Sequence, residues 1–253
     1  MKEIIHYLET KDFPHGGLYI LRSRKIYLLA VCHPIGVNGV GPHKHNDWLS
    51  FELCVGDQPV IIDPGTFCYT GNMEMRSLFR STAYHNTVVV DGQEQILILN
   101  RMFALRNPYG EARALSWETG ISQDVLETEH TGYTRLSSPV VHRRCFSLEK
   151  EKEHMEITDE FLGKGEHLLE WYFHLDVGLE CQLADRMAVV YRDQRALLHI
   201  TFPDSTEKPY KQSGLVSRSY NYRQEAEVIC LKCRKGLENS ESYTFQFFPN
   251  FDL

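Results

Sequence analysis

Residues 49–55 read Leu-Ser-Phe-Glu-Leu-Cys-Val, with a large apolar side chain at every odd position. Because successive side chains of a β-strand point to opposite faces, this alternation predicts a strand with one buried face. Gly56-Asp57 then supplies a turn, and residues 59–62, Pro-Val-Ile-Ile, predict the returning strand. The stretch therefore predicts a β-hairpin.

The same pattern recurs along most of the chain. Further strand-like segments cover residues 86–90, 188–191, 196–200, 226–229 and 243–247. Asp91-Gly92 marks another hairpin turn, and the best helical segment covers residues 73–79, with Asn72 as its N-cap. Repeated strand–turn signals predict an all-β fold, one large antiparallel β-sandwich (a super-sandwich) over residues 1–253 with at most one or two short helices.

The composition narrows the classes of partner. The chain has 253 residues, of which 42% are hydrophobic, so it can fill a sizeable core. Its 27 Lys and Arg against 34 Asp and Glu give a net charge of −7, which disfavours a broadly basic nucleic-acid surface. No apolar run approaches the ~18 residues of a transmembrane helix, and the first residues lack the apolar stretch of a signal peptide. We expect neither nucleic acid nor a membrane as partner.

Seven cysteines, an odd number scattered through apolar segments, predict buried free thiols rather than a disulfide framework. Cys230 and Cys233 have the spacing of a zinc or redox pair, but no second pair accompanies them. In a strand, residues three apart point to opposite faces, so two core thiols are the favoured interpretation.

Three segments carry residues that suit metal chemistry. His43 and His45 stand two apart, Asp63 ends the returning strand of the hairpin, and His85 precedes another strand. Two imidazoles and one carboxylate form a three-ligand set suited to zinc, with a fourth position open. Other interpretations stay open at this point: a surface His-x-His coincidence, a turn-forming carboxylate, and a core histidine.

These segments resemble the heparinase II/III-like domain, the C-terminal β-sandwich region of polysaccharide lyases that act on heparan sulfate, heparin and alginate. The resemblance rests on residues 41–47 (Gly-Pro-His-Lys-His-Asn-Asp), 60–66 (Val-Ile-Ile-Asp-Pro-Gly-Thr), 79–88 (Phe-Arg-Ser-Thr-Ala-Tyr-His-Asn-Thr-Val) and 91–93 (Asp-Gly-Gln). Weaker similarity continues through residues 142–144, Asp159, His167 and residues 173–175.

The resemblance implies roles for particular residues. His45, Asp63 and His85 would bind a structural Zn²⁺, and His43 would face the substrate as the catalytic histidine. Tyr69 and Arg80 lie in matching segments and would reach a bound uronate, although an aromatic core contact and a structural ion pair are equally open.

The family's lyases also carry an N-terminal helical (α/α) toroid, which supplies a catalytic Tyr and an Asn or His that neutralises the uronate carboxylate. These 253 residues hold nothing that resembles it. We expect a fragment of a polysaccharide lyase that is inactive without the toroid, with an acidic, uronate-containing polysaccharide and the toroid domain as its partners. With the net charge negative, local cations would have to attract this substrate. The candidates are Arg76, Arg80, Arg101 and Arg106.

Two other function classes compete with the lyase interpretation. A non-catalytic carbohydrate-binding or structural module would use zinc only to hold loops together. A metallo-hydrolase is disfavoured, because the pattern that begins His43-x-His45-x-Asp47 requires a further histidine where Trp48 stands. The resemblance implies a periplasmic or secreted protein, whereas the cysteine usage leaves the cytoplasm open.

Overall fold

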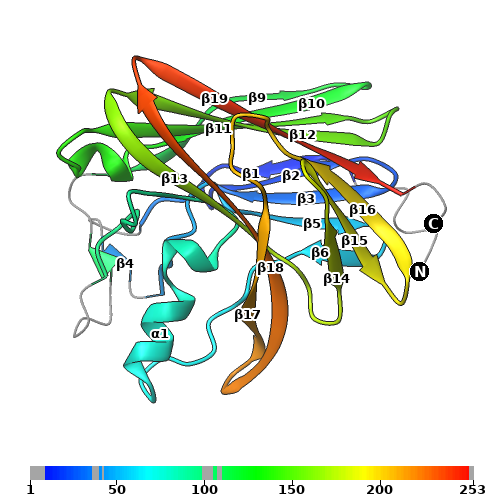
Figure 1. The fold of residues 1–253 in the computed structure, drawn as a ribbon, viewed down its shortest axis with the longest axis horizontal. Helices are drawn as coiled ribbons and strands as arrows, with labels where there is room; N and C mark the ends of the chain where they lie inside the picture. Colours follow the sequence, from blue (N-terminus) through cyan, green and yellow to red (C-terminus); the bar gives the residue numbers. More distant parts are fainter. Residues whose placement is uncertain (1–8, 36–39, 42, 99–104, 107–109, 251–253) are drawn as a thin grey trace.

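The structure, a computed structural model, describes residues 9–35, 40–41, 43–98, 105–106 and 110–250 (Figure 1). Named strands pair antiparallel throughout this part of the chain, which contains one short α-helix, α1 (Met73–Phe79), and the 3-10 turns η3 (Thr82–Tyr84) and η4 (Gly132–Arg135). No described helix is long and apolar enough to cross a membrane. The predicted all-β fold is confirmed.

The described strands form three large sheets and one small one. The five-stranded sheet has the order β1 (Lys11–Phe13), β2 (Leu18–Arg22), β3 (Ile26–Val31), β5 (Phe51–Val55) and β6 (Gln58–Ile61). The eight-stranded sheet has the order β14 (Glu180–Leu183), β15 (Met187–Arg192), β16 (Arg195–Thr201), β19 (Ser240–Pro249), β12 (His154–Gly163), β11 (Val140–Glu149), β10 (Gln123–His130) and β9 (Ala112–Thr119). The four-stranded sheet has the order β17 (Tyr210–Ser219), β18 (Tyr222–Leu237), β13 (Gly165–His174) and β7 (Val88–Val90). The small sheet pairs β4 (Val40–Gly41) with β8 (Leu105–Arg106).

Local signals in the sequence place several of these elements. The predicted hairpin forms as β5 and β6, and Gly56 takes a positive φ of 61° in its turn. Helix α1 begins after Asn72, whose side chain accepts a hydrogen bond from the Met75 amide at 2.9 Å. The Asp91-Gly92 turn also forms, but β7 takes its partner from β13 rather than from a strand that returns directly. All seven cysteines are free, as predicted.

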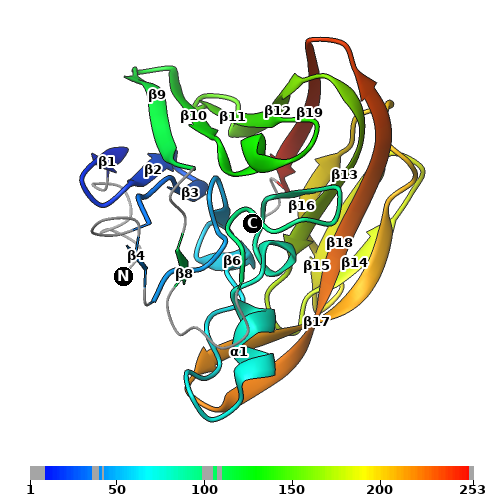
Figure 2. The same ribbon diagram turned by 90° about the vertical axis from the view of Figure 1, so that its left-hand side faces the viewer.

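The three large sheets meet at one buried aromatic side chain. The Phe51 ring centroid lies 6.0 Å from that of Phe146 in β11, 6.2 Å from Phe173 in β13 and 6.1 Å from Phe247 in β19. Figure 2 shows β13, β17 and β18 of the four-stranded sheet on the opposite side of the molecule from β1, β2 and β3. Because Phe51 begins β5, the apolar alternation that predicts this strand also joins the layers.

A charged network lies inside this apolar core. The Asp159 carboxylate accepts hydrogen bonds from Arg144 Nε at 2.7 Å and Nη2 at 2.8 Å, from Trp171 Nε1 at 2.9 Å and from His142 Nε2 at 2.6 Å. All four residues are buried. Burial alone would raise the pKa of Asp159, but Arg144 and His142 hold it well below its usual range. The carboxylate is therefore ionised and fully paired, as a buried charge requires.

Arg144 also contacts two loops outside its sheet. Arg144 Nη1 donates to the carbonyl oxygens of Leu49 and Asn86, at 2.7 Å each. Leu49 has a positive φ of 58°, a conformation that costs energy for a residue with a side chain. The buried ion pair thus fixes the backbone just before β5 and just before β7.

We expect Arg144→Met to lower the free energy of unfolding by about 3 to 5 kcal/mol, because it leaves Asp159 buried without its cation. Arg143→Met is the matched control. Arg143 is the next residue of the strand, is 42% exposed and pairs with Glu129, so its loss should cost about 1 kcal/mol or less. Urea unfolding measures both variants. A cost for Arg144→Met no larger than that of the control would contradict the role assigned to the pair.

Candidate functional site

The loop between β4 and β5 carries the predicted His-x-His pair and places its two imidazoles in different surroundings. His43 is exposed, whereas His45 is half-buried. Between them, Lys44 is buried, and its ammonium donates to Asp47 Oδ1 at 2.6 Å. Burial and the neighbouring His85 lower the pKa of His45 to about 4. At neutral pH the His45 ring is therefore uncharged and keeps a lone pair for a ligand.

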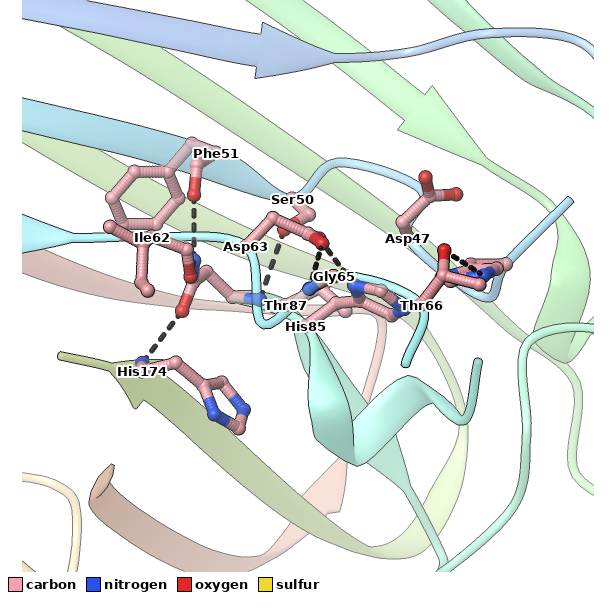
Figure 3. Close-up of polar contacts among 12 residues, drawn as sticks. Asp47, Ser50, Phe51, Ile62, Asp63, Gly65, Thr66, His85, Thr87 and His174 are labelled. Carbon is pink, nitrogen blue, oxygen red and sulfur yellow. Dashed lines mark hydrogen bonds and ion pairs between the residues drawn. The ribbon is translucent and has the colours of Figure 1, made fainter. Parts of the chain in front are cut away.

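Asp63 follows β6 and faces His85 (Figure 3). Its Oδ1 atom accepts a hydrogen bond from the Gly65 amide at 2.8 Å, and its Oδ2 atom accepts one from His85 Nδ1 at 2.7 Å. Burial raises the pKa of Asp63, but the charge and hydrogen bond of His85 outweigh burial and lower it. The turn-forming role of this carboxylate and its contact with the histidine therefore coexist.

His85 is fully buried directly after η3. Its Nε2 atom is also buried and has no hydrogen-bond partner within the described part of the chain. The His45 ring centroid lies 5.2 Å away, and Thr66 Oγ1 lies 3.5 Å from His45 Nε2. Burial lowers the pKa of His85, but the Asp63 carboxylate more than offsets this, so the pKa is raised. A cation at the unpaired Nε2 atom would thus be favoured by the adjacent carboxylate.

The donor chemistry of this site fits a metal ion. Two imidazoles and a carboxylate converge, and a buried imidazole nitrogen without a partner is what a metal ligand looks like in the absence of its ion. Among the residues that the structure describes, however, no group of three His, Cys, Asp or Glu side chains is already arranged to hold an ion. Zinc at His45, Asp63 and His85 stays a prediction.

Tyr69, predicted to contact substrate, lies beside the exposed histidine. Its ring centroid is 5.3 Å from that of His43, with the two rings nearly perpendicular. The guanidinium of Arg76 lies over the Tyr69 ring at 5.3 Å, and its Nη1 atom donates to the Tyr69 carbonyl at 3.3 Å. The structure therefore brings an aromatic ring, a cation and His43 together.

Arg80 lies beneath the surface, with 1% of its area exposed. Burial and the neighbouring Arg76 lower its pKa, against the influence of Glu94, and its carbonyl oxygen accepts a hydrogen bond from the Asn46 amide at 2.9 Å. This placement favours the structural role left open for Arg80 over substrate contact. Of the other arginines weighed as cations, Arg101 lies outside the described residues, as does the side chain of Arg106.

Asn86, for which no role was predicted, links the site to the sheets. Its Nδ2 atom donates to the carbonyl oxygens of Phe51 at 2.7 Å and Ile62 at 2.9 Å, and its Oδ1 atom accepts from the His174 amide at 2.7 Å. His85 directly precedes Asn86, and Asp63 directly follows Ile62. The hydrogen bonds of Asn86 therefore lie next to both members of the Asp63–His85 pair. The signal available in the sequence was an amide residue directly beside a candidate ligand.

Comparisons with known proteins identify the family of the chain. Residues 8–245 match the family described as heparinase II/III-like, C-terminal. The chain is 26% identical over 250 residues to a heparin-sulfate lyase of Pedobacter heparinus, and the match covers 95% of this chain and 35% of that protein.

Solved structures share the fold. The heparan sulfate lyase HepC from Pedobacter heparinus superposes with a TM-score of 0.79 at 22% identity, and a heparinase III structure, the BT4657 gene product, with 0.78 at 20%. Each likeness covers 96% of this chain and 36% of the other. The chain thus spans about a third of the length of these relatives, and it belongs to the heparinase II/III-like family through that family's C-terminal domain.

Proposed function

We propose that this chain is the β-sandwich portion of a lyase that cleaves a uronate-containing polysaccharide by β-elimination. In this proposal His45, Asp63 and His85 hold a structural Zn²⁺, and His43 acts on the substrate. The observation that carries the proposal is the contrast within one loop, where His43 is exposed beside Tyr69 while His45 lies next to the buried, unpaired nitrogen of His85.

The relatives and the chemistry of elimination support the substrate class. One relative is named a heparin-sulfate lyase, which supports an acidic, uronate-containing polysaccharide as the substrate here. In the reaction a base removes the C5 proton, the electrons of that C–H bond form the C4=C5 double bond, and the C4–O bond breaks. An acid then protonates the leaving oxygen.

His43 suits one of these proton transfers. An imidazole accepts and donates protons near neutral pH, and an exposed ring can approach a bound sugar. His45 is unsuited to the same work because a pKa of about 4 makes it a weak base that carries no extra proton to donate at neutral pH, and its buried neighbours favour ligand binding. A bound zinc ion would supply a cross-link between the loops that carry His45, Asp63 and His85. We propose that a helical domain outside this chain supplies the remaining groups that neutralise the uronate carboxylate.

We expect the protein, purified without chelators, to contain about one equivalent of zinc. His45→Ala and His85→Ala should each lose the metal and unfold at a lower temperature, because each removes one of three ligands. His43→Ala is the matched control, since it removes a histidine from the same loop and should retain the zinc. Metal analysis by inductively coupled plasma mass spectrometry, with thermal unfolding, measures both properties. A wild-type protein that contains no metal would contradict the zinc assignment.

In a chain that carries both this domain and the helical domain, we expect His43→Ala to lower kcat by about 10²-fold or more, the scale of a lost acid–base group. Zinc content and Tm should stay unchanged. The unsaturated uronate product absorbs in the ultraviolet, so heparan sulfate cleavage can be followed directly. The isolated 253-residue chain is the negative control and should form no product. An unchanged kcat in His43→Ala would remove this residue from the mechanism and favour a non-catalytic binding module.

A further inference from the structure

We propose that Tyr220, together with Tyr69, forms a stacking platform for one sugar ring of an acidic oligosaccharide, next to His43. This inference rests on the proposed function and extends it to a subsite. Tyr220 lies in the turn between β17 and β18, far along the chain from the residues of the candidate site. In both Figure 1 and Figure 2 this end of the two strands lies beside α1, which directly follows the loop that carries Tyr69.

Backbone contacts hold the β17–β18 turn against the loop that begins with Asp63. The Ser217 amide donates to the Pro64 carbonyl at 2.7 Å, and the Asn221 amide donates to the Phe67 carbonyl at 2.8 Å. At Gly65, with a φ of 85°, an added Cβ atom would lie 2.2 Å from the Ser217 carbonyl oxygen. Only glycine allows so close an approach, so the position of Tyr220 relative to the site is fixed by the fold.

The aromatic rings continue from His43 out to the turn. The Tyr69 and Tyr220 rings are stacked, with centroids 6.1 Å apart and planes 23° from parallel. The His43 ring lies nearly perpendicular to the Tyr69 ring at the inner end of this pair, and Arg76 places its guanidinium over Tyr69. The row therefore runs from an exposed imidazole to an exposed phenol with a buried cation against its centre.

Exposure and charge favour a sugar with acidic groups as the occupant. Tyr220 is 58% exposed although its ring already has an aromatic partner. The C–H bonds of a pyranose face carry partial positive charge, which the negative face of an aromatic ring attracts. Arg223, exposed on the same hairpin with its guanidinium 5.0 Å from the Phe67 ring centroid, can bind a carboxylate or sulfate group through its fork of donors.

The test is binding of a defined heparan sulfate hexasaccharide to the 253-residue chain, measured by isothermal titration calorimetry. We expect Tyr220→Ala to raise Kd about fivefold to tenfold, the scale of one lost ring contact. Tyr220→Phe should remain within about twofold of the wild type, because it keeps the ring. Tyr222→Ala is the matched control. Tyr222 is 53% exposed on the same hairpin, and its loss should change Kd by less than about twofold.

The outcomes separate this subsite from the proposed function. If Tyr220→Ala binds the hexasaccharide as tightly as the wild type does, the platform is overturned and the proposed function still stands. Equal weakening by Tyr220→Ala and Tyr222→Ala would also overturn it, because the contact would then be an unspecific surface effect. No binding by the wild-type chain would also overturn the platform, whereas the proposed function is decided by the cleavage assay on the chain that carries both domains. Since Tyr220 is exposed, its variants should keep the wild-type Tm, and this excludes unfolding as the cause of weaker binding.

Discussion

The ion pair between Arg144 and Asp159 is the constraint on which the candidate site depends. A charge buried among aromatic rings is tolerated only when every polar atom has a partner, and here the remaining donor of Arg144 is satisfied by the carbonyl oxygens of Leu49 and Asn86. The hydrogen bond from Arg144 to the Asn86 carbonyl fixes the backbone directly beside His85. The electrostatic requirement of the core therefore sets the geometry of the loops at its edge, and the site inherits its rigidity from the sheets.

Much of the fold and part of the site could be predicted from the sequence, because the signals are local. Period-2 alternation identified the hairpin of β5 and β6, and a side-chain oxygen at Asn72 identified the start of α1. The three candidate ligands were also named together, and the structure brings Asp63 to His85 and His85 close to His45. These residues end or precede strands, where a sheet gathers the side chains of distant segments at one edge.

The rest depended on pairings between distant segments that no local pattern reveals. Arg144 and Asp159 face each other only because β11 and β12 pair in one particular register. In the sequence Tyr220 looks like any exposed aromatic residue in a polar turn, and its stacking on Tyr69 appears only when the hairpin is packed on the loop after Asp63. For Arg80 the sequence left substrate contact and a structural ion pair open, and the burial of its side chain at the end of α1 favours the structural role. Residue type indicated the chemistry, whereas register and burial decided which residues can perform it.

The central claim is that the fold shifts the pKa values of two neighbouring histidines in opposite directions. His85 hydrogen-bonds to Asp63, whereas half-buried His45 has no acidic hydrogen-bond partner in the described part of the chain. Titration of the imidazole nitrogens in the metal-free protein by ¹⁵N NMR tests this most directly. We expect His45 to titrate near pH 4 and His85 to titrate above the ordinary histidine value of about 6.5. Titration of both rings near 6.5, or of His85 below His45, would contradict it.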